Sequence, residues 1–170
     1  MGLFGSIFGG AVGFALGGPL GAMMGAMMGG RVSGATSRTQ HAGGYSAQEM
    51  QAVFTVALVS LAAKVAKADG RVCEDEIRAF DDFLKNNMRL SKAERVNAAR
   101  VFNLARDNTN DATEFAAQLK QLFRSDRNRL RDIITLLFMI ALADGDLHPQ
   151  EKELIGQIAQ AMGLNMHDVE

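Results

Sequence analysis

Residues 67–84 read KADGRVCEDEIRAFDDFL, and residues 142–159 read LADGDLHPQEKELIGQIA. The two stretches align without a gap at an offset of 75 residues, and each follows a long apolar segment. Four residue types coincide in the alignment: Ala68, Asp69, Gly70 and Glu76 match Ala143, Asp144, Gly145 and Glu151. This internal repeat predicts a domain of two helix–turn–helix units related by a pseudo-twofold axis.

Apolar residues in the remainder of the domain follow helical rather than strand spacing. Residues 46–68 predict a long central helix, residues 127–143 a second apolar helix, and residues 149–162 an amphipathic one. The capping box SKAE at 91–94 predicts a helix with Val96, Ala99, Phe102 and Ala105 facing inward. Two more helices are marked by Ile77, Phe80, Phe83 and Leu84, and by Phe115, Leu119, Leu122 and Phe123. The fold class predicted for the domain is therefore all-α.

Residues 1–30 have a different composition, with no charged side chain and with glycine at every fourth position. The row consists of Gly5, Gly9, Gly13, Gly17, Gly21, Gly25 and Gly29. At about 1.5 Å per residue, an uncharged helix of this length spans the hydrocarbon core of a bilayer, which is about 30 Å thick. The composition predicts a glycine-zipper transmembrane segment at residues 1–30.

The small residues along this segment give it a packing role in lipid. Glycine at GxxxG spacing lets two helix backbones approach closely, which favours a homo-oligomer formed through the membrane segment. Three alternatives stay open: a lone anchor without specific packing, a signal peptide that lacks the usual basic start, and a re-entrant hairpin instead of a kink at Pro19.

The flanking charges predict which side of the membrane holds the domain. Arg31 and Arg38 follow the apolar segment, and only the α-amino group precedes it. The positive-inside rule then places the rest of the chain in the cytoplasm. Residues 31–45 are polar and contain glycine, so they predict a linker, and residues 46–170 predict the helical domain.

The repeated motif carries a resemblance to a known family. An apolar helix followed by ADG-x-[VL]-x-x-x-E, with the same motif 75 residues later, resembles the TerB-like (tellurite-resistance) domains. A glycine-rich membrane segment before such a domain resembles the front part of the membrane-anchored DnaJ-like co-chaperones of bacteria. The resemblance implies a single-pass protein of the bacterial inner membrane. Those co-chaperones carry a J domain with His-Pro-Asp, whereas His148-Pro149 is followed here by Gln150, so J activity is not implied.

The acidic residues of the repeat have two interpretations. Asp69-Gly70 and Asp144-Gly145 fall where helices end, and Glu76 and Glu151 fall at the third position of the next helices. Acidic residues there cap a helix and complement its dipole. Alternatively, Asp69, Glu76, Asp144 and Glu151 meet across the pseudo-twofold axis and bind calcium or another divalent cation. The resemblance supports the second interpretation slightly, since TerB-like domains are associated with acidic, calcium-binding surfaces, although neither loop has EF-hand spacing.

Charge and motifs exclude several other classes of protein. The formal net charge of −1 does not predict a nucleic-acid-binding protein. Four basic residues, Lys120, Arg124, Arg127 and Arg131, lie on one side of a helical region and form a solvated face or an interaction face. The chain has no P-loop, no G-x-S-x-G and no H-E-x-x-H, so no enzyme activity is expected.

Two functions follow from these observations. The first is a membrane-anchored, self-associating adaptor that contacts lipid and binds a protein partner through its TerB-like domain, in stress response or envelope maintenance. The second is a cation-responsive module at the membrane. Neither function requires a cofactor.

Overall fold

The computed structural model describes residues 18–27, 47–68, 70, 72–108, 111–143 and 145–165. Over these residues the chain forms seven α-helices and no strand. The expected all-α class is confirmed. The linker at residues 31–45 and most of the glycine row lie outside the described residues.

The centre of the fold is α4 (Ala47–Ala66), which contacts α3 (Gly18–Met27), α6 (Lys92–Asp107), α7 (Ala112–Leu122), α8 (Arg127–Ala141) and α9 (Pro149–Met162). Its middle is buried on every side, because Ala52, Val53 and the run from Val56 to Val59 have no exposed surface. A helix that is apolar all round needs neighbours on all sides. The sequence pattern at residues 46–68 therefore predicted both the helix and its central place.

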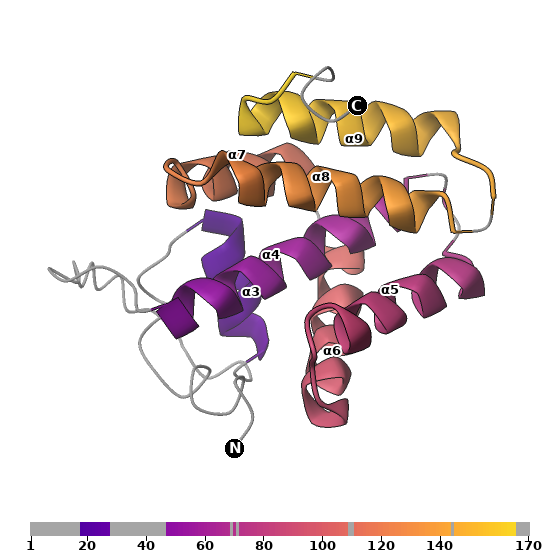
Figure 1. The fold of residues 1–170 in the computed structure, drawn as a ribbon, viewed down its shortest axis with the longest axis horizontal. Helices are drawn as coiled ribbons and strands as arrows, with labels where there is room; N and C mark the ends of the chain where they lie inside the picture. Colours follow the sequence, from indigo (N-terminus) through magenta and orange to yellow (C-terminus); the bar gives the residue numbers. More distant parts are fainter. Residues whose placement is uncertain are drawn as a thin grey trace, which may run out of the picture.

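The two copies of the repeat form two helix–turn–helix units. α4 is followed by a turn and by α5 (Glu74–Asn86), and α8 is followed by a turn and by α9. Both turns lie at the same end of the molecule, while α4 and α8 both begin at the opposite end (Figure 1). The helices expected at 127–143 and 149–162 are observed at Arg127–Ala141 and Pro149–Met162.

The inward face expected for α6 is partly wrong. Its capping box is present, with the Ser91 N–H donating to Glu94 Oε2 at 2.8 Å. Ala105 is buried and Phe102 is partly buried against the core, as expected. However, Val96 is 49% exposed and Ala99 is also exposed, whereas Ala98 and Val101 are buried in their place. The helix is turned by about one position from the expected face, because its small residues pack against α4.

The described part of the predicted membrane segment packs onto the domain. α3 contacts α4, α6 and α7, and its Leu20 and Met23 are 0% and 1% exposed. The Leu20 N–H donates to Gln118 Oε1 of α7 at 3.0 Å.

Pro19 lies in the first turn of α3 rather than at a kink within a helix. Gly18 has φ +61°, a left-handed conformation that interrupts a right-handed helix. Among the helices that the structure describes, none combines the length and apolar character needed to cross a bilayer. Of the glycine row, Gly21 and Gly25 lie in α3, while Gly5, Gly9, Gly13, Gly17 and Gly29 lie outside the described residues. The membrane span and its oligomer stay predictions.

Candidate functional site

The turns of the two repeats have matching backbone geometry. Gly70 and Gly145 have φ +85° and +98°, which glycine adopts without steric cost. The Gly70 N–H donates to Lys67 O at 2.8 Å, and the Gly145 N–H donates to Leu142 O at 3.0 Å. The two copies therefore end their first helices in the same way, as the aligned sequence indicates.

The glutamates of the repeat cap the helices that follow. Glu76 Oε2 accepts the Cys73 N–H at 2.8 Å, and Glu151 Oε2 accepts the His148 N–H at 3.2 Å. Both glutamates occupy the third helical position, and Pro149 begins α9. The capping interpretation of Glu76 and Glu151 is confirmed by these bonds.

The same two glutamates also meet each other between the two repeats. Their side chains are buried, with Glu76 6% and Glu151 1% exposed. Burial, together with the hydrogen bond to the Glu76 carboxyl, raises the pKa of Glu151 to about 7. Two buried carboxyls in contact cannot both ionise without strong repulsion, so one proton shared between them stabilises the pair. A bound cation could take the place of that proton.

The complete acidic quartet is not described. Asp69 and Asp144 lie outside the described residues, so their distance from Glu76 and Glu151 is not part of this structure. The residues that are described contain no group of three or more His, Cys, Asp and Glu side chains that could hold a metal ion. Calcium takes six to eight oxygen ligands, which one pair of carboxylates does not supply. The four-carboxylate site stays a prediction.

The four basic residues are distributed over two helices and the turn between them rather than over one helical face. Lys120 is near the end of α7, Arg124 lies in the turn, and Arg127 and Arg131 lie in α8. Arg127 Nη2 donates to Gly163 O at 3.3 Å, and the Lys120 side chain is also next to Gly163. Two of the four cations thus stand at the carboxyl end of α9, where they complement the helix dipole.

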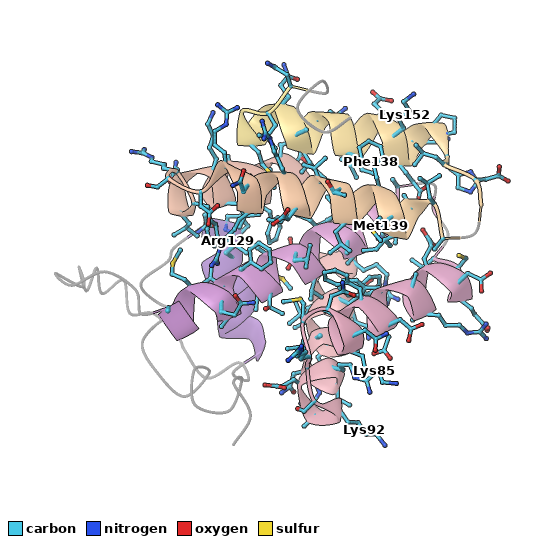
Figure 2. The ribbon with its side chains drawn as sticks, viewed as in Figure 1. Lys85, Lys92, Arg129, Phe138, Met139 and Lys152 are labelled. Atoms are coloured by element: carbon cyan, nitrogen blue, oxygen red, sulfur yellow. The ribbon has the colours of Figure 1, made fainter. Side chains whose placement is uncertain are left out.

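Arg129 holds this turn in place through contacts with three side chains. Its guanidinium lies 5.8 Å from the centre of the Phe54 ring and 5.6 Å from that of Phe123. Its Nε is 3.0 Å from Asp126 Oδ2. Figure 2 shows Arg129 at the beginning of α8, on the side that faces α4. The contact joins residues 75 positions apart (Phe54 and Arg129), which no local pattern could indicate.

A groove between α5 and α6 was missed by the sequence analysis. It encloses about 320 Å³, and its apolar lining comes from Val72, Ile77, Phe80, Leu84, Ala99 and Phe102. The Phe80 and Phe102 rings lie 6.0 Å apart, and Ile77 is 50% exposed. The sequence signal for the groove is an excess of apolar positions on both helices, but the same positions are equally consistent with burial in the core.

Polar side chains border this groove. Arg95 forms an ion pair with Asp81, yet its buried Nε makes no hydrogen bond within the described part of the chain. Arg106 also lines the groove and pairs with Asp107, at 3.0 Å between Nε and Oδ1. An apolar depression with arginines beside it suits a ligand that has an apolar body and an acidic group.

The chain was compared with protein families, with curated proteins and with solved structures. The family described as "Tellurite resistance protein TerB" matches residues 55–170. The co-chaperone protein DjlA of Aliivibrio fischeri is 29% identical over 132 residues, which cover 78% of this chain and 46% of the relative. DjlA of Escherichia coli K12 is 28% identical over 118 residues, which cover 69% of this chain and 43% of the relative. No solved structure matches the chain.

The chain spans less than half the length of the curated relatives it matches. The family match, in contrast, covers both ADG turns, both capping glutamates and α4 from Thr55 onward. By its sequence and its paired helix–turn–helix units, the chain belongs to the TerB family.

Proposed function

We propose that the protein is a co-chaperone-like adaptor that binds a partner protein in the α5–α6 groove. The observation that carries this proposal is an apolar face that the fold leaves open. Ile77, which lines the groove, is 50% exposed, although its spacing is that of a core residue. Large apolar side chains left at a surface depression are typical of protein interaction sites. The similarity to co-chaperones supports an interaction role over a catalytic one.

The groove favours a particular kind of partner segment. A helix that inserts one large apolar side chain beside Ile77 and Phe102 would cover apolar surface that the fold leaves exposed at Ile77 and partly buried at Phe102. A carboxylate on the same helix would find Arg95 and Arg106 beside that anchor. The proposed partner segment is therefore an amphipathic helix with an acidic residue next to its apolar anchor.

The finer parts of the proposal concern location. Residues 1–30 would anchor the chain in the bacterial inner membrane and associate with other copies through the glycine row, with the domain on the cytoplasmic side. This arrangement requires α3 to leave the position on the domain where Leu20 and Met23 are buried in this structure. The uncharged segment followed by Arg31 and Arg38 supports this orientation. An adaptor held there would serve stress response or envelope maintenance.

A photocrosslinking experiment tests the adaptor function. A benzophenone amino acid in place of Ile77 should capture a specific protein in cells, whereas the same group in place of exposed Asp82, outside the groove, should not. With the captured protein purified, Ile77→Lys should weaken binding by about tenfold or more, and Asp82→Ala should leave it unchanged. Equal capture at both positions, or unchanged affinity of Ile77→Lys, would contradict the proposal.

A second candidate function rests on the contact between Glu76 and Glu151. We propose that Asp69 and Asp144 join this buried pair to bind calcium or another divalent cation, which would then lock the two repeats together. A ligand of the folded state raises the melting temperature as its concentration rises. The proposal expects calcium to raise the melting temperature of the wild type and expects Asp144→Asn to abolish the shift. If the carboxylates only cap helices, calcium leaves both melting curves unchanged.

A further inference from the structure

The charges of the domain are separated toward opposite ends of its long helices. Residues 120–131 contain five cations, Lys120, Arg124, Arg127, Arg129 and Arg131, against the single carboxylate Asp126. Residues 69–76 contain four carboxylates and one cation, and so do residues 142–153. α8 begins beside the first group and ends at one of the acidic turns, and α4 runs between the same two ends (Figure 1). The α7–α8 turn therefore carries an excess of cations, and the segments of the two repeat turns carry an excess of carboxylates.

The basic end is also where the N-terminal region joins the domain. Ala47 and Met50, at the start of α4, line one recess together with Leu122, Phe123 and Arg129 of the α7–α8 turn. The start of α4, which the predicted linker precedes in the sequence, therefore lies beside the α7–α8 turn. A cluster of four or more Lys and Arg residues next to a membrane segment favours contact with anionic lipids.

Two of the five cations, Arg127 and Arg129, are held by other groups, and three of the five are exposed. Arg129 is fixed between two phenylalanine rings and Asp126, and Arg127 is tied to Gly163 O. Lys120, Arg124 and Arg127 are exposed. A prearranged surface loses little side-chain entropy when it meets a lipid headgroup layer.

We propose that this basic corner, defined as Lys120, Arg124, Arg127, Arg129 and Arg131, docks the domain on the anionic surface of the bilayer. The ligand is the layer of phosphate-bearing lipid headgroups, and the contact orients the acidic turns away from the membrane. The proposal rests on the proposed anchoring for its geometry. It adds a charge-dependent contact that the anchor alone does not provide.

A fluorescent probe beside the corner tests the contact in the full chain. Cys73→Ser removes the single native cysteine while keeping a capping side chain, and Ser125→Cys places a polarity-sensitive dye next to Arg124. The emission is compared in vesicles of phosphatidylcholine alone and in vesicles with about 30% phosphatidylglycerol. Docking predicts a blue shift only with the anionic lipid, and its loss at about 0.5 M salt.

Matched charge variants show whether the corner itself is responsible. Lys120→Gln with Arg124→Gln should lower the equilibrium constant for docking by about fivefold for each removed charge. Lys85→Gln with Lys92→Gln removes the same charge from exposed positions on α5 and α6, far from Arg129 in Figure 2, and should leave docking unchanged. Because Lys120 lies beside Gly163, its substitution also disturbs that contact. Arg124→Gln alone removes one charge and leaves the contact intact.

The outcomes separate the corner from the anchor. An identical dye signal in neutral and anionic vesicles, or equal losses in both double variants, would overturn the docking proposal. If the basic corner bound a soluble protein and the dye showed no shift with anionic vesicles, the docking proposal would be overturned as well. Anchoring is judged independently by flotation of the unlabelled chain with phosphatidylcholine vesicles at high salt. If the chain fails to float there yet shows the charge-dependent dye shift, the anchoring proposal is wrong and the docking proposal is supported.

Discussion

At the scale of single residues, the contact between Glu76 and Glu151 has the clearest consequence, because it makes the stability of the fold depend on pH below neutrality. The folded state raises the pKa of Glu151 to about 7 from its ordinary value of 4.5. Between these values the folded chain keeps a proton that the unfolded chain releases. The stability contributed by this proton is complete below about pH 4.5 and is lost as the pH rises through about 7.

We therefore expect the free energy of unfolding to fall between about pH 5 and about pH 8, and Glu151→Gln to remove much of that fall. The amide keeps an oxygen for the His148 N–H and no longer ionises opposite Glu76. Urea unfolding across this range measures the effect. Glu94→Gln, at the equivalent capping position of α6, is the control and should lower stability without flattening the pH profile. Parallel profiles for the wild type and Glu151→Gln would contradict the shared proton.

At the scale of elements, α3 is a short helix whose place depends on two side chains. A ten-residue helix with two internal glycines is unstable alone, so Leu20 and Met23 must hold it on the domain. We expect Leu20→Ala to lower the free energy of unfolding by about 2–4 kcal/mol.

Hydrogen exchange should show faster exchange in α3 of Leu20→Ala than in α8. Ala22→Ser, on the exposed side of the same helix, should change neither the stability nor the exchange. If Leu20→Ala left both quantities unchanged, the docking of α3 would be refuted.

The helices were predictable from the sequence because their signals are local. The capping boxes at Ser91 and in the repeat, Pro149, and the glycines at 70 and 145 fix helix ends within a few residues. The face of α6 was not predictable, because alanine and valine are both apolar and only the fit against α4 decides which of them faces inward. The α5–α6 groove was missed for the same reason, since periodicity marks an apolar position without showing whether a neighbour covers it.

At the scale of the whole molecule, the glycine row still requires a test of assembly. If glycines at every fourth position let helices pack in lipid, Gly13→Ile with Gly17→Ile should abolish oligomers in detergent while the chain still enters membranes. Native mass spectrometry measures the oligomer size. Gly2→Ile, outside the row, is the control for added bulk. An unchanged size in the double variant would remove the packing role of the row.

The relation to co-chaperones gives a second test at this scale. The 170 residues contain no His-Pro-Asp tripeptide, which is the motif that J domains are expected to use with Hsp70. We therefore expect this chain alone to leave the ATPase rate of an Hsp70 at its basal value. A steady-state ATPase assay, with an intact J-domain protein as positive control, checks the expectation. Stimulation by the chain would show a mode of engagement that does not need the tripeptide.

The meeting of Glu76 with Glu151 also bears on how such a domain could arise from a single helix–turn–helix unit. If two half-length chains paired as the two repeats do here, the same carboxyl would meet its own copy in a dimer. Such a dimer would take up a proton as it assembled near neutral pH, and its association would weaken in alkali. Fusing two copies into one chain makes the encounter intramolecular. The proton then affects the stability of the contact between the two repeats rather than the association of two molecules.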